Sequence, residues 1–234
     1  MPVRTLEPRT ILLLAGLLLT ACLLASSAEA ASRLLGAPSY DHATETTYRQ
    51  VYWEDFRGSN ASKPPEWNRW SRGSYAHIAT KIELGKVEFE DRREGDVWLV
   101  SAPRVRPYAL MNKDFSAVRH GARNAYTLAH EQLHFDIAET VARRLAVELA
   151  QLEGRGSTQK AAYDNLTGQL RQRFEAGFQE FIELQERYDA ETEHGLKKKK
   201  QKKWAEEVPE MFRQATEALA AFLEQRGRSG TADR

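Results

Sequence analysis

The segment His130-Glu131-Gln132-Leu133-His134-Phe135-Asp136 lies inside a run, Ala122 to Glu153, that contains neither glycine nor proline. Apolar residues recur in this run every three or four positions, which predicts an amphipathic helix. They are Leu133, Ile137, Val141, Leu145, Leu149 and Leu152. His130 and His134 lie four residues apart, so they project from one face of that helix, one turn from each other. Two imidazoles at this spacing can bind one metal ion, and the adjacent Glu131 can face a water on that ion.

The same spacing also occurs on ordinary amphipathic helices that carry two surface histidines. The HExxH pattern by itself is therefore only moderately specific. The interpretation as a metal site depends on what the rest of the chain supplies.

Two further segments accompany this helix. Downstream, Tyr188-Asp189-Ala190-Glu191-Thr192-Glu193-His194-Gly195 is followed by Gln201 and Trp204, and upstream stands Trp53-x-Asp55-Phe56-x-Gly58. Together with the string His130–Glu139, they resemble the signature of an uncharacterised bacterial family of predicted secreted zinc-dependent proteases. The resemblance implies a zincin-like fold, a Zn²⁺ cofactor and peptidase activity, but it names no substrate.

The pattern before the helix predicts strands. Apolar and polar residues alternate from Ala76 to Leu84, and Val97–Val100 is a short apolar run, whereas Asp91–Gly95 reads as a loop. In zincin-like folds an edge strand can pair with an extended substrate, and Val97–Ala102 and Tyr108–Met111 are the candidates for this role. A plain structural role is the alternative for both strands.

The pattern after the helix predicts two more helices. Gly154–Ser157 reads as a turn, and Ser157 or Thr158 can cap a second helix that runs to about Tyr188. The run Lys197–Lys203 reads as a solvated loop, with contact to anionic envelope polymers or lipid headgroups as the alternative. A last helix has Pro209 in its first turn and ends at Gly227.

These elements predict an α+β fold, and the family resemblance implies that it is zincin-like. A small N-terminal β-sheet packs on the HExxH active-site helix, which is followed by two further helices. We expect a single metallopeptidase domain over residues 51–227, a loose segment over residues 31–50, and a disordered tail over residues 228–234.

Residues 1–30 have the composition of an export signal. Arg4 and Arg9 precede an apolar run from Ile11 to Ala25, and Ala28-Glu29-Ala30 offers small residues for cleavage. Leu19-Thr20-Ala21-Cys22 resembles a bacterial lipobox, which would make Cys22 a lipid-anchored first residue. We therefore expect export to the periplasm or cell envelope of a bacterium, and no transmembrane helix in the mature chain.

Cysteine content and charge exclude several classes of function. Cys22 is the only cysteine, so thiolate zinc ligands, a cysteine nucleophile and disulfides are all excluded from the mature domain. Any metal must be bound by His, Asp or Glu. The formal net charge is +1, which gives no reason to expect a nucleic-acid partner.

A catalytic zinc site needs a third protein ligand. Asp136 and Glu139 lie on the far side of the helix from the histidines and are unsuitable. Two helices joined by a short turn pack antiparallel, so the end of the second helix returns toward His130. His194 is our first choice as the third ligand, because it stands beside Gly195 just past that helix, and Asp189 is the second choice.

The expected function is an exported zinc-dependent metallopeptidase. Glu131 would act as the general base on a zinc-activated water, and Tyr188 could donate to the oxyanion. The substrate would be a polypeptide or peptidoglycan. Two alternatives remain: a hydrolase of peptidoglycan amide bonds, and a non-catalytic envelope binding protein that is stabilised by zinc.

Overall fold

The computed structural model describes residue 41, residues 43–58 and residues 75–232. The predicted export signal, the lipobox at Cys22 and most of the predicted loose segment therefore lie outside the described residues. The described chain groups into two compact units, one built from Leu84–Pro107 and Arg144–Gly177 and the other from the remaining described segments. Within the described residues no helix is long and apolar enough to cross a membrane.

The first unit contains a three-stranded antiparallel sheet in the order β3-β4-β6. Its strands are β3 (Glu90–Glu94), β4 (Val97–Ser101) and β6 (Glu153–Gly156). The predicted loop at 91–95 and the predicted turn at 154–157 are both wrong, because these residues are mostly strand. Gly95, at φ 57°, makes the tight turn between β3 and β4. Position 156, in β6, requires a glycine, because a Cβ there would lie 2.6 Å from the backbone nitrogen of Ala162.

The second unit contains a sheet in the order β1-β5-β2. Its strands are β1 (Glu45–Thr47), β2 (Ala76–Leu84) and β5 (Pro107–Val118), and the short helix η1 spans Trp53–Asp55. The candidates for an edge strand, Val97–Ala102 and Tyr108–Met111, were wrong, since β4 and β5 are the central strands of their sheets. Among the described strands, β2 is the one at an edge and next to the HExxH helix.

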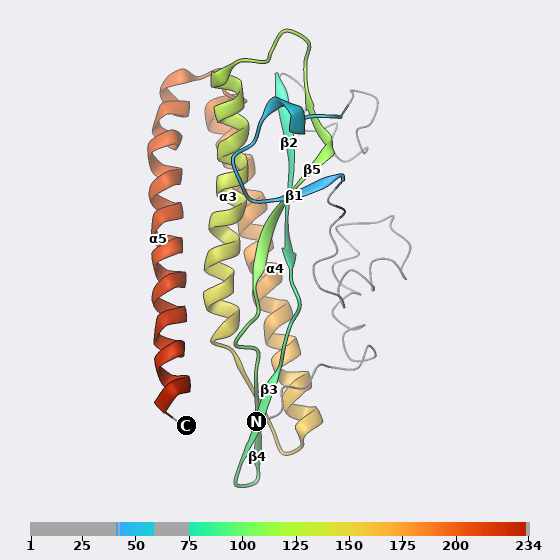
Figure 1. The fold of residues 1–234 in the computed structure, drawn as a ribbon, viewed down its shortest axis with the longest axis vertical. Helices are drawn as coiled ribbons and strands as arrows, with labels where there is room; N and C mark the ends of the chain where they lie inside the picture. Colours follow the sequence, from blue (N-terminus) through green and yellow to red (C-terminus); the bar gives the residue numbers. More distant parts are fainter. Residues whose placement is uncertain (1–40, 42, 59–74, 233–234) are drawn as a thin grey trace. The chain divides into compact units, whose positions relative to one another are not determined.

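Three helices follow β5 in the described chain, with β6 between the first two (Figure 1): α3 (Ala125–Ala150), α4 (Gln159–Thr192) and α5 (Lys198–Ala232). Two of them begin at side-chain caps. The Asn124 Oδ1 accepts from the backbone N–H of Thr127 at 2.9 Å, and the Thr158 hydroxyl accepts from the backbone N–H of Ala161 at 3.1 Å. The predicted α+β class and the HExxH helix are confirmed, and a helix of this kind beside a small sheet is consistent with a zincin-like arrangement.

The third helix differs most from the sequence-based expectation. It begins at Lys198, so the lysine run is helical rather than a loop, and Pro209 lies inside the helix instead of in its first turn. The helix also continues through Gly227 into the tail that was expected to be disordered. A glycine costs a helix only about 1 kcal/mol, so one glycine does not oblige it to end.

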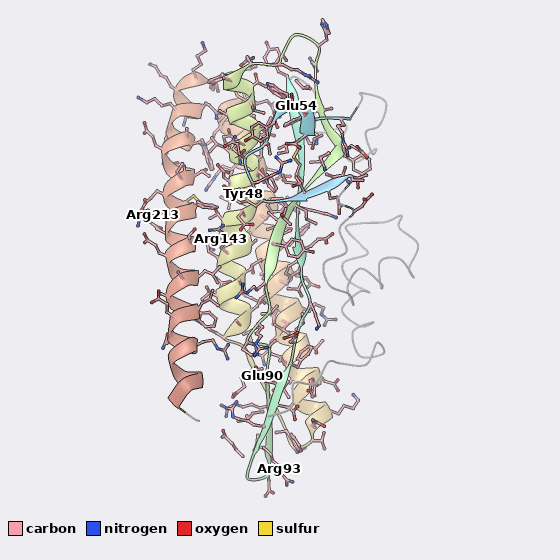
Figure 2. All side chains as sticks on the ribbon, viewed as in Figure 1. Tyr48, Glu54, Glu90, Arg93, Arg143 and Arg213 are labelled. Atoms are coloured by element: carbon pink, nitrogen blue, oxygen red, sulfur yellow. The ribbon has the colours of Figure 1, made fainter. Side chains whose placement is uncertain are left out.

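Residues near the start of the described chain fasten the second unit together. Asp55 receives two hydrogen bonds from the Arg49 guanidinium and one from the backbone N–H of Tyr52. Tyr48 donates to Asp136 on α3 at 2.9 Å, and Arg143 on the same helix lies over the ring of Phe212 on α5 (Figure 2). These contacts hold α3 against both the N-terminal segment and α5.

Candidate metal centre

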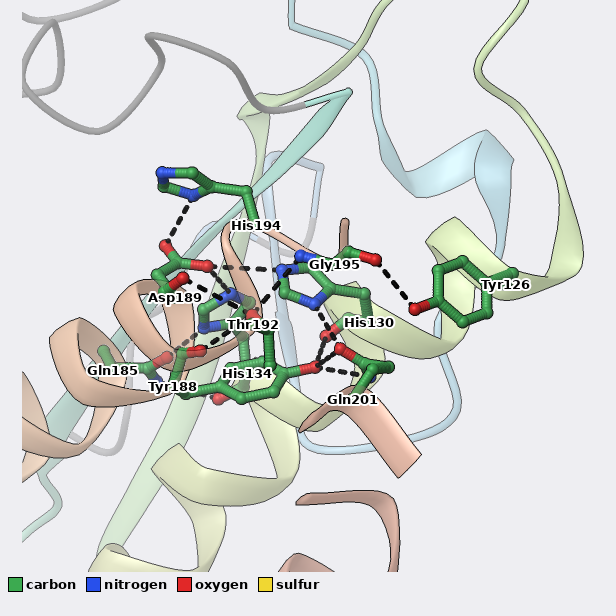
Figure 3. Close-up of polar contacts among 10 residues, drawn as sticks. All are labelled: Tyr126, His130, His134, Gln185, Tyr188, Asp189, Thr192, His194, Gly195 and Gln201. Carbon is green, nitrogen blue, oxygen red and sulfur yellow. Dashed lines mark hydrogen bonds and ion pairs between the residues drawn. The ribbon is translucent and has the colours of Figure 1, made fainter. Parts of the chain in front are cut away.

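Three side chains from two helices of the second unit converge on one point (Figure 3). The Nε2 atoms of His130 and His134, on α3, lie 3.2 and 3.1 Å from the same atom, Oδ1 of Asp189 on α4. The three groups can each offer one ligand atom, and these atoms lie within 4.8 Å of one another. Tetrahedral zinc with bonds of about 2.0–2.1 Å has ligand atoms roughly 3.4 Å apart, close to the observed separations.

The other ring nitrogen of His134 is bound by an amide from α4. The Gln185 side-chain NH₂ donates to the backbone carbonyl of His134 at 2.8 Å, which leaves the Gln185 Oε1 facing the His134 Nδ1. An amide oxygen can only accept, so Nδ1 carries the proton and Nε2 presents a lone pair. The orientation of one glutamine therefore determines the tautomer of this histidine.

His130 is held in the same tautomer by α5. The Gln201 NH₂ donates to the Tyr188 hydroxyl at 2.7 Å, and that hydroxyl donates to the backbone carbonyl of His130. The Gln201 Oε1 is then left to accept from the His130 Nδ1 at 2.8 Å. The Nε2 of His130 consequently points a lone pair at Asp189, as His134 does.

This arrangement requires a cation. Two imidazole lone pairs and a carboxylate oxygen face one another, and such atoms repel unless a metal ion or protons lie between them. Burial alone would raise the pKa of Asp189, but His134, His130 and His194 outweigh burial when protons take the place of a metal ion, and they then hold its pKa well below the usual range. The carboxylate is therefore ionised and suited to bind a metal, and these three residues fit a zinc ion by donor type and by spacing.

His194 lies outside this three-residue group. Its Nδ1 is 3.2 Å from Oδ2 of Asp189, the carboxylate oxygen that faces away from the other two histidines. The hydrogen bond to Asp189 raises the pKa of His194. The structure thus places Asp189, our second choice, in the position expected for His194, and it places His194 where it holds that carboxylate in orientation.

The loop after α4 explains why His194 turns this way. Glu193 and His194 have positive φ angles of 48° and 54°, which residues with a Cβ seldom adopt. Gly195 follows at φ 84°, and a Cβ there would lie 3.3 Å from the His130 Nδ1. Tyr126 of α3 fixes the loop by donating to the carbonyl of Gly195 at 2.7 Å. The loop therefore passes directly against the ring of His130.

Glu131 is buried next to the three-residue group. Its carboxyl accepts a hydrogen bond from the backbone N–H of Ile78 on the edge strand β2. Burial raises the pKa of Glu131 to about 7, although His130 and the Ile78 amide lower it. A carboxyl group with this pKa can both accept and return a proton near neutral pH.

Tyr188 does not occupy the position expected of an oxyanion donor. The side chain is fully buried, and its hydroxyl is engaged with the carbonyl of His130 and the amide of Gln201. Its ring stacks on the His130 ring with centroids 4.7 Å apart. Burial also raises its pKa. These contacts make Tyr188 a residue that positions His130, with no access to a substrate.

A cavity of about 470 Å³ opens beside Glu131. His130, Glu131 and His194 form one wall, and the start of β2, the loop after β5 and the start of α5 form the others. Of the other histidines, His120 lines this cavity, His77 lies in β2, and His42 is outside the described residues. One of the three buried candidate ligands, His130, therefore borders a space large enough for a side chain of a ligand.

Sequence reasoning missed the role of the two glutamines. Gln185 and Asp189 lie four residues apart on α4, the same spacing as His130 and His134 on α3. This repeated spacing was the sequence signal that could have placed Gln185 beside the site. Gln201 belonged to the quoted downstream motif, but the sequence assigned it no partner.

Comparison with known proteins agrees with a bacterial relationship. Residues 118–195, which include the HExxH segment and the block that ends in His-Gly, match the sequence model of a bacterial protein family of unknown function, DUF922. No curated protein and no solved structure matches the chain. The region similar to this family contains both helices that supply the three candidate metal ligands, so the similarity covers the candidate metal centre.

Proposed function

We propose that this protein is an exported zinc-dependent metallopeptidase in which His130, His134 and Asp189 bind the metal. The observation that carries the proposal is the convergence of two Nε2 atoms on Oδ1 of Asp189, with both Nδ1 protons held by glutamine oxygens. A site that stabilised the fold alone would not need a buried carboxyl group of raised pKa beside it, next to an open cavity.

The donor set favours zinc. Two neutral imidazoles and one carboxylate are a common set for a catalytic zinc site, in which a fourth position remains open. A zinc ion bound there would polarise a carbonyl oxygen and lower the pKa of a water to about 7.

Glu131 has the position and the pKa of a general base. It follows His130 directly and lines the cavity, so a water on the open side of the site lies within its reach. Its carboxylate accepts a proton from that water and returns it to the nitrogen of the leaving amine. Burial suits both steps, because it brings the pKa of Glu131 to about 7, close to that of a zinc-bound water.

The edge strand supplies a means of holding an extended substrate. β2 is at the end of its sheet among the described strands, and its residue Ile78 already reaches Glu131 through its backbone N–H. An extended peptide added to that edge would run past the catalytic carboxyl. Polypeptides are therefore the proposed substrate, and peptidoglycan stem peptides satisfy the same geometry. The proposed compartment is the periplasm or envelope, on the basis of residues 1–30.

Replacing Glu131 tests the enzyme proposal. Glu131→Gln should retain stoichiometric zinc but lose about 10²–10⁴-fold in hydrolysis of casein or a peptide library, because only the proton acceptor is removed. Asp136→Asn is the matched control, since it neutralises a carboxylate on the same helix that faces Tyr48 instead of the metal site. Equal cleavage by Glu131→Gln and wild type would refute the proposal. Failure of the wild type to cleave proteins, peptides or peptidoglycan would favour the zinc-stabilised binding protein.

A further inference from the structure

The cavity beside Glu131 has a basic side. Arg119, in the loop after β5, and Lys198, in the first turn of α5, both line it, together with His120. Among the described residues that line the cavity, Glu131 is the only acidic one, and the proposed mechanism already uses it. A ligand group that enters this space therefore meets the positive charges of Arg119 and Lys198.

Lys198 differs from most of the lysines around it. Within the run 197–203, Lys197 lies 2.7 Å from Glu193 and Lys203 lies 3.2 Å from Glu207. In the described part of the chain, no carboxylate lies within ion-pair distance of Lys198. Its ammonium group is thus available to a ligand, whereas most of its neighbours are already compensated.

The same cavity has an apolar side. Tyr75, Tyr126 and Leu196 line it and are 49%, 40% and 53% exposed, which places them among the most exposed large hydrophobic side chains of the described chain. Exposed apolar side chains gathered in a cavity and bordered by charge are characteristic of a ligand site. Tyr126 cannot swing away freely, since it is hydrogen bonded to Gly195.

We infer that this cavity selects substrates with a carboxylate close to the scissile amide, borne on an apolar stem. The inference rests on the proposed function and specifies its substrate class. The methylene groups of such a residue would lie against Tyr75, Tyr126 and Leu196, and the carboxylate would reach Arg119 and Lys198. The carboxylate can belong to an acidic side chain, such as that of glutamate, or to the end of the chain.

Two hydroxamates that differ in one group test this inference by binding alone. Each carries a metal-binding hydroxamate next to a glutamyl or a glutaminyl residue, and their affinity for the zinc-loaded full chain is measured by calorimetry. The glutamyl compound should bind about tenfold more tightly, as expected from two solvent-accessible ion pairs. A second pair, alanyl hydroxamates ending in a free carboxylate or an amide, distinguishes a chain terminus from an acidic side chain.

Variants identify the residues responsible. Arg119→Gln with Lys198→Gln should abolish the preference for the carboxylate, because both proposed cationic partners are removed. Lys199→Gln is the matched control, as it removes one positive charge from the adjacent position, outside the cavity lining, and should retain the preference.

The outcomes separate the two proposals. Equal binding of the glutamyl and glutaminyl compounds, or a preference that survives in the double variant, would overturn the inference and leave the metallopeptidase proposal standing. Failure of every hydroxamate to bind the zinc-loaded protein would count against the metal site itself, and the inference would fail with it.

Discussion

Glu131 leads to a prediction about stability that needs no substrate. In the metal-free protein its side chain is almost fully buried, and burial raises its pKa from 4.5 to about 7. A carboxyl group whose pKa is raised in the folded state stabilises the fold fully below the unfolded pKa of 4.5. That stabilisation is lost as the pH rises through 7, where the buried group must ionise. Glu131→Gln keeps the shape of the side chain but cannot ionise.

The size of the effect follows from the two pKa values. The difference between 4.5 and about 7 corresponds to about 3.4 kcal/mol of unfolding free energy. About 2.5 kcal/mol of this is lost between pH 5 and pH 8. Titration of Glu131 should therefore lower the unfolding free energy of the wild type by this amount over this pH range. The Glu131→Gln protein has no such titration and should not show this loss. The stability of the variant minus that of the wild type should therefore rise by about 2.5 kcal/mol.

Urea unfolding of both proteins at pH 5, 6, 7 and 8, with a chelator present to keep the site free of metal, measures this difference. Groups other than Glu131 are common to both proteins, so their titration cancels to first order. Glu206→Gln is the control: Glu206 has a 69% exposed side chain on α5, and its replacement should give a difference that does not change with pH. A constant difference between Glu131→Gln and wild type from pH 5 to pH 8 would refute the reasoning.

Two further predictions concern zinc affinity, measured by competition with a chromophoric chelator. Asp189→Asn should nearly abolish binding, since it removes a charged ligand, whereas His194→Ala should cost about 10–100-fold, because only the orientation of Asp189 is relaxed. The opposite order would make His194 the third ligand. Gln185→Leu should also weaken binding by about 10–100-fold, as the His134 ring loses the acceptor that fixes its tautomer. Unchanged affinity in Gln185→Leu would show that Gln185 has no such role.

Features that depend on local sequence were predictable. The spacing of apolar residues around His130 and His134 predicted α3, and the cap at Thr158 predicted the start of α4, because helix periodicity and capping are properties of neighbouring residues. The convergence of the two histidines follows from the same periodicity. These parts of the site required no knowledge of the tertiary fold.

Features that depend on tertiary pairing were not predictable. β3 consists entirely of charged residues, and its propensity favours a loop, yet it pairs with β4 along its whole length. β6 contains two glycines, a composition that normally indicates a turn. In both cases a neighbouring strand determines the conformation, and a single sequence gives no direct sign of that strand. The same limit applies to Gln185 and Gln201, whose partners lie 51 and 71 residues away.

The third ligand shows where the sequence argument was incomplete. The antiparallel return of α4 toward His130 correctly identified the segment Tyr188–Gly195, but it did not fix which side chain would face the histidines. We expected His194, beside Gly195 and just past the helix, to be the third ligand, with Asp189 as the second choice. In the structure, α4 holds Asp189 so that its Oδ1 lies close to both Nε2 atoms. The left-handed backbone at residues 193 and 194 directs His194 to Oδ2 of Asp189 instead.

That division gives the two oxygens of Asp189 different tasks. Oδ1 faces the metal ligands, and Oδ2 is held by a histidine that also lines the cavity. A substrate of the proposed enzyme that entered the cavity would therefore contact, in His194, the group that orients a candidate metal ligand. A change at His194 should consequently affect both metal affinity and substrate binding, whereas a change at Gln185, which is buried and outside the cavity lining, should affect metal affinity alone. Measuring zinc affinity and hydroxamate binding on the same two variants separates these roles.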